Sequence, residues 1–482
     1  MKKLEVFILL VILLGGFLVK LYKFTSPIAD WHSWRQADTS AVSRNLVANF
    51  DVLHPKFDDL SKGVSLIDNP QGYRFVEFPI YNVLQAGLFK TSHILTIEEW
   101  GRLITIFSSF ASSLFVYLIV RRRQSEVSAL VAAFFMSFLP YNIYYGRTIL
   151  PDVSMVAASL GGIYFFDKWV EENSKLKTQN YFIITIVLTA VALLLKPFAA
   201  FFTLPMIVIA YQKYGLGFLR KRSLWTFFIL AVLPLFLWRI WENRYPEGIP
   251  QTGWLFNGGN IRFKGAFFYW IFGYRIARLV LGYWGLGLLI VGLISNKLTR
   301  NGWFFLSFIL SSLLYVTVMA KGNVQHDYYQ ILIIPSLAIF LGLGAEFLLK
   351  APAIFSKSVS IIVLLACTIS SLIFGWYFIR DYYNIQNSSI IAAGVAVDRL
   401  TPKTAKIIAP YGGDTTFLYN TKSRGLPVFD RPLADFIKQG ANYMVFVNPS
   451  KEELNFTNYF ATLDRGDKYI IYDLGKPIRP LK

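Results

Sequence analysis

The sequence contains little cysteine, little histidine and little charge. Cys367 is the only cysteine among 482 residues, so no disulfide can form within the chain and its exposed regions depend on packing. No group of histidine and cysteine has the spacing of a metal site. Charged residues make up 16% of the chain and hydrophobic residues 55%, whereas about a quarter of a soluble protein is charged. The composition therefore excludes an ordinary soluble protein and predicts a mainly α-helical, polytopic membrane protein.

Acidic residues are also scarce, since 48 basic and 29 acidic residues give a net charge of +19. A nucleic-acid-binding face would need the basic residues in one stripe, but here they cluster at the ends of apolar segments. The clusters are Lys2-Lys3, Arg121-Arg122-Arg123, Lys168 with Lys175 and Lys177, Arg220-Lys221-Arg222, Lys297 with Arg300, and Lys350 with Lys357. This distribution is typical of the cytoplasmic side of a membrane protein. It indicates topology and contact with anionic lipid, and argues against nucleic acid as a partner.

The apolar segments predict about eleven membrane spans, with the N-terminus in the cytoplasm. The predicted spans are 4–22, 101–120, 126–145, 153–170, 181–195, 198–212, 224–241, 277–295, 303–320, 330–349 and 358–378. We interpret the first as retained, because its apolar run is too long for a signal peptide and no small-x-small cleavage site follows it. Lys196-Pro197 predicts a tight external hairpin between two short spans, and one kinked span is the alternative.

Three long segments lie outside the membrane in this topology, at about 23–100, 242–276 and 379–482. In the first, Thr39–Phe50 and Pro79–Lys90 have amphipathic helical patterns, which we expect to lie in the membrane interface. The third has the composition of a soluble domain. It predicts strands at Lys406–Pro410, Tyr443–Asn448 and Tyr469–Leu474, and helices near 389–399, 431–439 and 450–463. The sequence thus predicts a transmembrane domain at 1–378 and a small extracytoplasmic α/β domain at 379–482.

Isolated charged and polar residues recur on the external side of this topology. They are Asp30, His32, Arg35, Asp38, Arg74, Glu77, Arg147, Asp152, Lys196, Lys321, His326 and Asp327. A charge at a membrane face costs a few kcal/mol unless it is wetted or paired, so such residues are candidates for function. They come from loops between different spans, and we expect them to converge.

Each candidate also has a purely structural interpretation. If a helix covers 34–49, Arg35 and Asp38 lie three residues apart on one face and could form an ion pair, or Asp38 could cap a helix that starts at Thr39. Glu77 before a proline could be a first-turn carboxylate, and Asp152 after Pro151 could open a helix. The aromatic residues beside His326 could belong to an interfacial belt.

The order of these elements resembles the GT-C class of membrane glycosyltransferases. The similarity is to the family that holds the protein O-mannosyltransferases and the lipid A aminoarabinose transferases, and it covers about 1–378. The shared elements are an acidic first external loop with Ser43-Arg44-Asn45-Leu46, Glu77 with Pro79, Arg147 with Pro151-Asp152, Lys196-Pro197, and Tyr328-Tyr329 before Pro335. The chain departs from the family where Gln36-Ala37-Asp38-Thr39 replaces an Asp-Glu pair and where Phe78 replaces a lysine.

The resemblance implies a sugar donor on polyprenyl phosphate, used at the outer face of a bacterial cytoplasmic membrane. It implies a base for the acceptor hydroxyl, for which Asp38 is the first choice and Asp30 the second. Glu77 and Asp152 would orient the base or hold sugar hydroxyls. The implied ligands of the phosphate are Arg35, Arg74, Arg147, Lys196 and His326.

The acceptor implied by the resemblance is a glycolipid, a polysaccharide or a protein. No metal is required for a monophosphate donor, because arginine and lysine can neutralise it. A diphosphate donor would favour Mg²⁺ or Mn²⁺ with Asp30, Asp38 and Asp152 as ligands. Two alternatives remain: a transporter or flippase of lipid-linked sugars, which would need polar residues along a path through the bilayer, and a membrane polysaccharide polymerase or ligase.

Overall fold

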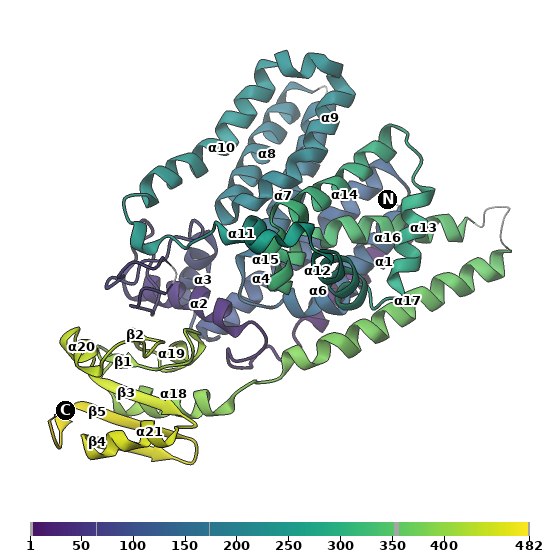
Figure 1. Ribbon diagram of the computed structural model, residues 1–482. Coiled ribbons are helices and arrows are strands. Elements are labelled where there is room, and N and C mark those ends of the chain that lie inside the picture. Colours follow the sequence, from purple (N-terminus) through teal and green to yellow (C-terminus); the bar gives the residue numbers. More distant parts are fainter. Residues whose placement is uncertain (1–2, 64, 173, 351–355, 481–482) are drawn as a thin grey trace. The chain divides into compact units, whose positions relative to one another are not determined.

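The structure is a computed structural model that describes residues 3–63, 65–172, 174–350 and 356–480 (Figure 1). The chain forms two compact units. The first, here the helical unit, comprises the chain up to Phe24, Arg102–Arg239 and Thr252–Asp381. The second, here the mixed unit, comprises Thr25–Gly101, Ile240–Gln251 and the chain from Tyr382 onward. The segment Thr25–Gly101, here called the external segment after its predicted side of the membrane, thus belongs with the C-terminal region. The sequence instead predicted one division, at residue 378.

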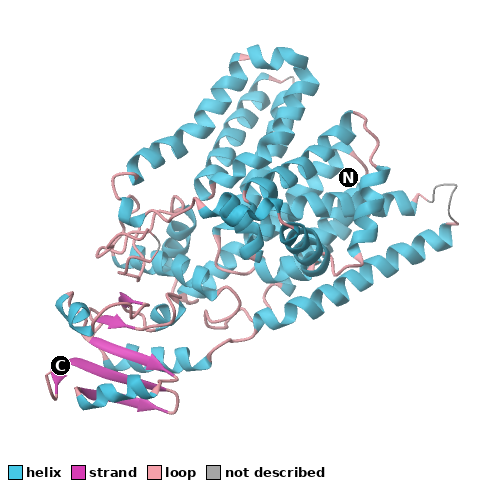
Figure 2. Cartoon of the chain, viewed as in Figure 1, coloured by secondary structure: helices cyan, strands magenta, loops and turns pink. Residues whose placement is uncertain are grey.

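The helical unit is built from a series of apolar helices (Figure 2). Its α-helices are α1 (Lys3–Val19), α4 (Ile97–Arg123, whose first residues belong to the mixed unit), α5 (Glu126–Phe138), α6 (Pro140–Tyr145), α7 (Pro151–Glu171), α8 (Lys175–Leu195), α9 (Leu204–Tyr214), α10 (Arg222–Glu242, whose last residues belong to the mixed unit), α11 (Trp254–Asn257), α12 (Gly265–Phe268), α13 (Gly285–Ser295), α14 (Arg300–Val318), α15 (Ala320–Gln325), α16 (Ile334–Leu349) and α17 (Lys357–Ile379). Short helices of other types connect them: η1 (Pro197–Thr203), η2 (Gly215–Arg220), η4 (Gly258–Phe263), the π-helix η5 (Tyr269–Val280), η6 (Asp327–Ile333) and η7 (Arg380–Tyr383).

Within the described residues, six helical segments are long and apolar enough to cross a membrane, or seven if one bent pair of helices is counted as a single span. They are Ile97–Arg123, Leu176–Leu195, Arg222–Glu242, Arg300–Val318, Asp327–Leu349 and Lys357–Leu400, and the bent pair is Gly265–Val280 with Gly285–Ser295. The chain is therefore a multi-pass membrane protein. The count of eleven spans stays a prediction, because several predicted spans coincide with short helices such as the 13-residue α5 and the 17-residue α1.

Helix α16 forms the centre of the helical unit, since 94% of its most apolar stretch is buried. Small residues let its neighbours approach closely. A Cβ on Gly344 would lie 2.2 Å from the Leu288 carbonyl oxygen of α13, and a Cβ on Gly342 would lie 2.5 Å from the Ser128 carbonyl oxygen of α5. By contrast, only 17% of the corresponding stretch of α10 is buried.

The mixed unit contains a five-stranded sheet in the order β2-β1-β3-β5-β4. Its strands are β1 (Lys406–Ile408), β2 (Arg424–Leu426), β3 (Tyr443–Val447), β4 (Phe460–Gly466) and β5 (Tyr469–Pro477). Strand β1 pairs in parallel with β2 and β3, and β5 pairs antiparallel with β3 and β4. The helices of this region are α18 (Ser388–Leu400), α19 (Thr416–Asn420), α20 (Leu433–Lys438), α21 (Lys451–Leu454) and η8 (Asn455–Asn458).

The predicted strands at 406, 443 and 469 and the predicted helices near 389–399 and 431–439 are confirmed. The predicted helix at 450–463 is wrong beyond residue 458, because β4 begins at Phe460. This strand pairs with β5 in a register that shifts between Thr462 and Asp464, and such an irregular edge strand carries only a weak alternating pattern. The three-residue strand β2 was not predicted.

The external segment packs on this sheet within the mixed unit. Ala29 belongs to the same buried cluster as Ile407 of β1 and Ile471 of β5. At the sheet edge, Gly425 of β2 donates its N–H to the Asp58 carbonyl and accepts the N–H of Leu60. The first external segment therefore extends the edge of the C-terminal sheet, and the region after Tyr382 shares its core with it.

Two helices of the external segment lie in the mixed unit, α2 (Ser33–Ala48) and α3 (Ile80–Thr91). The helix predicted at Thr39–Phe50 begins six residues earlier, at Ser33, and its polar side chains from Ser33 to Ser43 are buried, while its place in the membrane interface stays a prediction. Ser43 donates to the Gln85 side chain of α3 over 2.6 Å, and Asn82 of α3 donates to the Thr39 carbonyl over 2.6 Å. The polar side chains of α2 thus form hydrogen bonds inside the protein. Two of them, Arg35 and Asp38, belong to a charged cluster at the N-terminal end of the helix.

Candidate functional site

Asp38 is buried on α2 and both of its carboxylate oxygens are engaged. Arg74 lies 2.5 Å from Oδ2 through its Nη2, and the Thr415 hydroxyl donates to Oδ1 over 2.7 Å. Of the two structural alternatives for Asp38, pairing with Arg35 does not occur because Arg74 takes that place, and capping of a helix at Thr39 does not occur because α2 begins at Ser33. A carboxylate held by an arginine and a hydroxyl has a fixed orientation and keeps unused lone pairs.

A second ion pair lies beside the first. Arg35 Nη2 is 2.6 Å from Glu77 Oε1, and both side chains are almost fully buried. These two residues line one small cavity together with Asp38, Arg74 and Asn82. The other oxygen of Glu77 and two nitrogens of Arg74, Nε and Nη1, make no hydrogen bond within the described parts of the chain. The cavity therefore combines two carboxylates, two guanidinium groups and unused hydrogen-bonding capacity.

The segment before α2 carries Asp30 and His32. Asp30 is fully buried and accepts a hydrogen bond of 2.7 Å from the Gln36 side chain. His32 stands at the N-cap of α2 with φ 53° and ψ 35°, a left-handed conformation that few non-glycine residues adopt. Its ring lies 5.1 Å from that of Trp31, which stacks on Tyr382. Such a conformation persists only where the surroundings hold it in place, and is common at functional sites.

A short loop of the C-terminal region completes this cluster. The Thr415 hydroxyl, whose single proton is directed to Asp38 at 2.7 Å, also lies 3.3 Å from the Trp34 carbonyl oxygen. Thr416 donates to the Ser33 hydroxyl over 2.9 Å. Burial raises the pKa of the neighbouring Asp414 carboxyl, and the charge of Asp38 raises it further. Sequence reasoning missed this loop, because nothing in the residues 411–416 marks them as partners of a helix some 380 positions earlier.

Asp59 is a second carboxyl that sequence reasoning missed. It is buried, and burial raises its pKa to about 6 even though the Ser61 backbone N–H donates to it over 2.7 Å. The charge of Asp38 raises the pKa of Asp59 and the charge of Arg74 lowers it. A carboxyl with a pKa near neutrality beside an ion pair is a typical property of functional sites. The two adjacent acids Asp58 and Asp59 were the only mark of this site in the sequence. Of the two, Asp58 pairs with Arg44 and Asp59 lies near Asp38 and Arg74.

The helical unit holds a separate polar cluster around Asp152 and Lys196. Lys196 Nζ lies 2.5 Å from Asp152 Oδ1, and both side chains are buried. The ammonium group also faces the rings of Tyr328 and Tyr329, at 5.5 and 5.3 Å from their centroids. Asp152 Oδ2 makes no hydrogen bond in the part of the chain that the structure describes. This lysine therefore has one carboxylate partner, two aromatic faces and an acceptor oxygen beside it.

Asp327 links this cluster to Arg147. Its Oδ1 accepts a hydrogen bond of 2.6 Å from Tyr145, and Arg275 lies 3.5 Å from its Oδ2. Tyr144, whose ring is 5.0 Å from that of Tyr145, lies under the guanidinium group of Arg147 at 5.2 Å.

His326 lies next to Asp327 in the chain. The His326 ring stacks on Tyr328 at 5.5 Å and meets Trp254 edge-on at 5.9 Å. Through Tyr328, His326 is therefore connected to Lys196.

The predicted residues thus fall into two groups. Those of the mixed unit are Asp30, Arg35, Asp38, Arg74 and Glu77, and those of the helical unit are Arg147, Asp152, Lys196 and His326. Within each unit the structure brings together residues that are distant in sequence, while the convergence of the two groups stays a prediction. Among the described residues, no group of three or more His, Cys, Asp or Glu side chains is placed to hold a metal ion.

Comparisons with known proteins point to one kind of fold. The sequence profile of a family described as dolichyl-phosphate-mannose-protein mannosyltransferase matches residues 88–241. A comparison with curated protein sequences finds no significant match. Among solved structures, the chain resembles ArnT from Cupriavidus metallidurans in the apo state, with a TM-score of 0.65 at 10% identity over 96% of this chain and 97% of that one.

Two further structures are similar over nearly the whole chain. ArnT from the same organism bound to undecaprenyl phosphate has a TM-score of 0.62 at 10% identity, with the same coverage. The oligosaccharyltransferase of Archaeoglobus fulgidus in the apo form has a TM-score of 0.59 at 11% identity, over 94% of this chain and 73% of that one. At these identities the likeness establishes a shared fold, and the role of each residue has to be argued from its own surroundings.

Proposed function

We propose that this chain, which belongs by its fold to the GT-C class of membrane glycosyltransferases, moves a sugar from a polyprenyl-phosphate carrier to an acceptor hydroxyl. Membership of the class, predicted from the order of the external motifs, is confirmed by the family match and by the structural likeness to ArnT. The observation that carries the proposed donor is that the fold shared over 96% of the chain includes a structure bound to undecaprenyl phosphate.

The proposed chemistry needs a base, and Asp38 has the surroundings for one. An acceptor hydroxyl would pass its proton to this carboxylate as its oxygen bonds to the anomeric carbon and the bond from that carbon to the phosphate oxygen breaks. Arg74 pairs with one oxygen of Asp38, and the hydrogen bond from Thr415 to the other oxygen fixes the direction in which its lone pairs point. A positioned base of this kind contributes about 10²–10⁴-fold to the rate.

The leaving group is a phosphate monoester, whose developing charge must be met by cations. Lys196 and Arg147 are the proposed ligands in the helical unit, and His326 supports them through Tyr328. Lys196 is already paired with Asp152. A bound phosphate would therefore either replace Asp152 Oδ1 as the partner of the ammonium group or bind the ammonium group together with it. In the mixed unit, Arg35 and Glu77 are proposed to hold sugar hydroxyls, because both line one cavity and Glu77 Oε2 makes no hydrogen bond in the described parts of the chain. The acceptor is proposed to be a glycolipid, a polysaccharide or a protein outside the cytoplasm.

A lipid analysis tests the proposal. Cells lacking this chain should accumulate a polyprenyl-phosphate sugar, which mass spectrometry of extracted lipids would identify, and the wild-type gene should clear it. The Asp38→Asn variant, expressed to the same level in the membrane, should not. Accumulation of a lipid-linked sugar on the cytoplasmic leaflet alone, as judged by its protection from an external glycosidase in intact spheroplasts, would instead indicate a transporter. No accumulation of any such lipid would contradict the proposed donor.

A further inference from the structure

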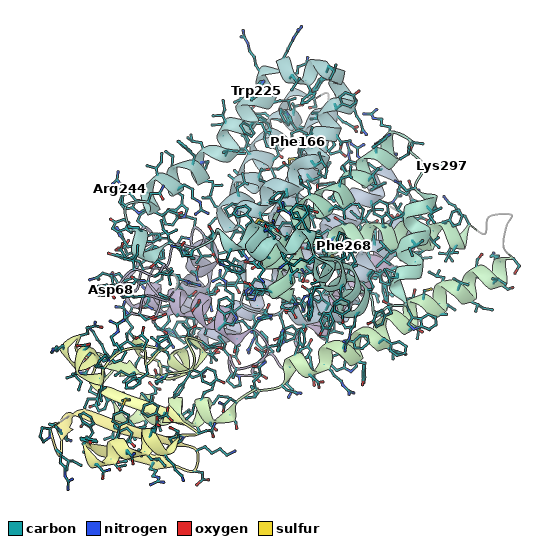
Figure 3. The ribbon with its side chains drawn as sticks, viewed as in Figure 1. Asp68, Phe166, Trp225, Arg244, Phe268 and Lys297 are labelled. Atoms are coloured by element: carbon teal, nitrogen blue, oxygen red, sulfur yellow. The ribbon has the colours of Figure 1, made fainter. Side chains whose placement is uncertain are left out.

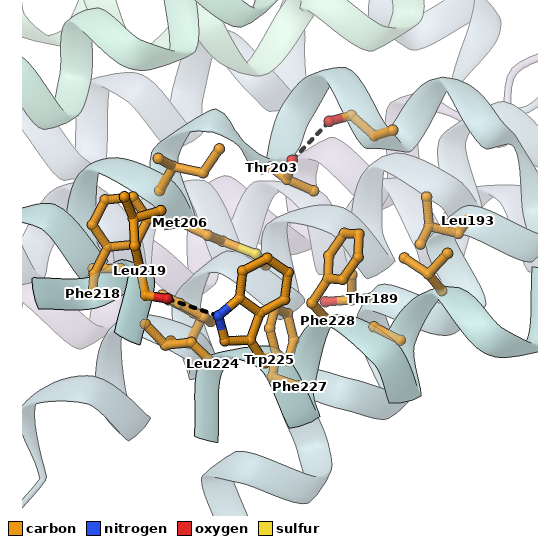
Figure 4. Close-up of a pocket in the computed structure, with 16 residues that line it drawn as sticks. Thr189, Leu193, Thr203, Met206, Phe218, Leu219, Leu224, Trp225, Phe227 and Phe228 are labelled. Atoms are coloured by element: carbon orange, nitrogen blue, oxygen red, sulfur yellow. Dashed lines mark hydrogen bonds between the residues drawn. The ribbon is translucent and has the colours of Figure 1, made fainter. Parts of the chain in front are cut away.

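A cavity of about 370 Å³ lies among α7, α8, η1, α9 and α10 in the helical unit (Figure 4). All residues that line it are hydrophobic except Thr189 and Thr203, and the Thr203 hydroxyl donates to the Ala200 carbonyl of its own turn. None of the lining residues belongs to the two polar clusters described above. The cavity is therefore separate from the residues proposed to carry the chemistry.

The cavity exists because α10 packs loosely on its neighbours. Most of α10 is exposed along its apolar stretch, and Ala231, which is buried, faces the cavity from this helix. Phe166 on α7 and Trp225 on α10, both labelled in Figure 3, line it from opposite helices. A space of this size and apolarity offers water too few hydrogen-bond partners, and an empty space loses the dispersion contacts of its lining. A flexible hydrocarbon chain needs no hydrogen bonds and restores those contacts.

One end of the cavity carries a concentrated positive charge. Phe218, Leu219, Leu224 and Trp225 line the cavity at this end, and Arg220-Lys221-Arg222 lies between them in the chain. These three side chains and nearby Lys213 are exposed, and within the described residues none of them forms an ion pair with a carboxylate. The Lys221 ammonium lies 4.8 Å from the Tyr214 ring centroid. The indole N–H of Trp225 donates to the Leu219 carbonyl over 2.8 Å, so the tryptophan holds the basic turn against the cavity.

We propose that this cavity binds an anionic phospholipid, with one acyl chain among α7–α10 and the phosphate on Arg220, Lys221 and Arg222. From Trp225 to Val232 the lining of α10 extends about 10 Å along the helix, which gives a chain a path away from the charged end. Cations beside an apolar groove attract anionic headgroups, and a zwitterionic lipid would fill the same groove without that attraction. The bound chain supplies the packing that α10 lacks. This inference is independent of the proposed glycosyl transfer.

Native mass spectrometry of the full-length protein tests the proposal. The protein in detergent would be offered equimolar phosphatidylglycerol and phosphatidylcholine with identical acyl chains, and we expect phosphatidylglycerol to be retained at least tenfold more. The triple variant Arg220→Gln, Lys221→Gln, Arg222→Gln should lose this preference. A matched control, Lys177→Gln, Lys297→Gln, Lys357→Gln, removes the same charge from exposed lysines outside the cavity and should keep it.

Filling the cavity distinguishes this site from the rest of the surface. Ala231→Phe should lower retention of both lipids at least fivefold, and Ala210→Phe, from α9, serves as a second filling variant if the first fails to fold. Equal retention of the two lipids by the wild type, equal loss in the control triple, or unchanged retention in a folded filling variant would overturn the proposal. It would also be overturned if polyprenyl phosphate, added in equal amount, displaced phosphatidylglycerol, since the cavity would then hold the donor.

Discussion

The hydroxyl of Thr415 donates a 2.7 Å hydrogen bond to Oδ1 of Asp38, although the two residues are 377 positions apart. The same carboxylate is held at its other oxygen by Arg74. The orientation of the proposed base is therefore determined by one residue of the first external segment and one of the C-terminal region. This relationship assigns the C-terminal region a part in the proposed site and leads to the first prediction.

Thr415→Val should lower the rate of sugar transfer while leaving the protein folded. A hydrogen bond to a charged group contributes about 1.5–3 kcal/mol, so the loss should be about 10- to 100-fold in kcat, with little change in KM for the donor. Thr415→Ser keeps the hydroxyl and should restore most of the rate. The measurement is transfer from the accumulated lipid donor by purified enzyme. A Val variant as active as the Ser variant would show that Thr415 does not position the base.

Asp38→Asn should remove transfer, with a loss of about 10²–10⁴-fold, because the amide keeps the shape of the carboxylate and cannot take a proton. Asp30→Asn is the variant for comparison, since Asp30 is also buried and accepts a hydrogen bond from Gln36. If the Asp30 variant is inactive and the Asp38 variant is not, the two roles are exchanged. Activity in both variants would refute the mechanism.

Asp59 should make the stability of the protein depend on pH. Burial raises its pKa to about 6, above the usual value of about 3.9 in an unfolded chain, so folding favours the protonated form. That stabilisation is fully present below about pH 4 and is lost as the pH rises through 6, by at most about 3 kcal/mol. Asp59→Asn retains the acceptor for the Ser61 N–H and cannot ionise.

The measurement for Asp59 is the difference in Tm between the variant and the wild type in detergent, followed from pH 4 to pH 8. The Tm of the variant minus the Tm of the wild type should be several degrees higher at pH 8 than at pH 4. Taking the difference removes the titration of other groups from the comparison. A constant difference across this range would show that Asp59 has an ordinary pKa in the folded protein.

The sequence predicted features that depend on local pattern. The strands at 406, 443 and 469 are runs of apolar residues bounded by turns, and a helix was predicted at Thr39–Phe50, where α2 runs from Ser33 to Ala48. The partners of charged residues could not be found in this way. Spacing along the helix offered Arg35 as one possible partner of Asp38, but the pairing is decided by tertiary packing, which brings Arg74 to Asp38 and Glu77 to Arg35.

The same limit explains why the start of α2 was missed. Its polar side chains between Ser33 and Ser43 are buried, and Asn82 and Gln85 of α3 form hydrogen bonds with this helix. Sequence alone does not distinguish a solvated polar face from one that pairs with another helix. The C-terminal loop at Thr415 was missed for a related reason, since a single hydroxyl has no local pattern at all.

Removing one partner of the buried pair Lys196–Asp152 should destabilise the helical unit. Lys196→Met leaves Asp152 as a buried carboxylate without its cation, and breaking such a pair costs about 3–5 kcal/mol. Asp152→Asn in the same chain removes the uncompensated charge and should recover most of the loss. Thermal unfolding of the single and double variants measures this. If the single variant unfolds at the wild-type temperature, water or another cation compensates Asp152.

Arg147→Ala should weaken use of the polyprenyl-phosphate donor more than affinity for the acceptor. Arg147 is buried, and its guanidinium group lies on the Tyr144 ring. Tyr144 contacts Tyr145, which donates a hydrogen bond to Asp327. The next residue in the chain, Tyr328, lies against the Lys196 ammonium group. If Arg147 meets the charge of the departing phosphate, its loss should raise KM for the donor and lower kcat together, because a phosphate without its cation leaves poorly. The donor dependence and the acceptor dependence of the rate would be measured separately with the purified variant.

Arg147→Lys keeps the charge without the planar fork and should recover part of the rate but not all of it. An Ala variant with unchanged donor dependence would show that other residues hold the phosphate, and Lys196 would then be the next residue to test.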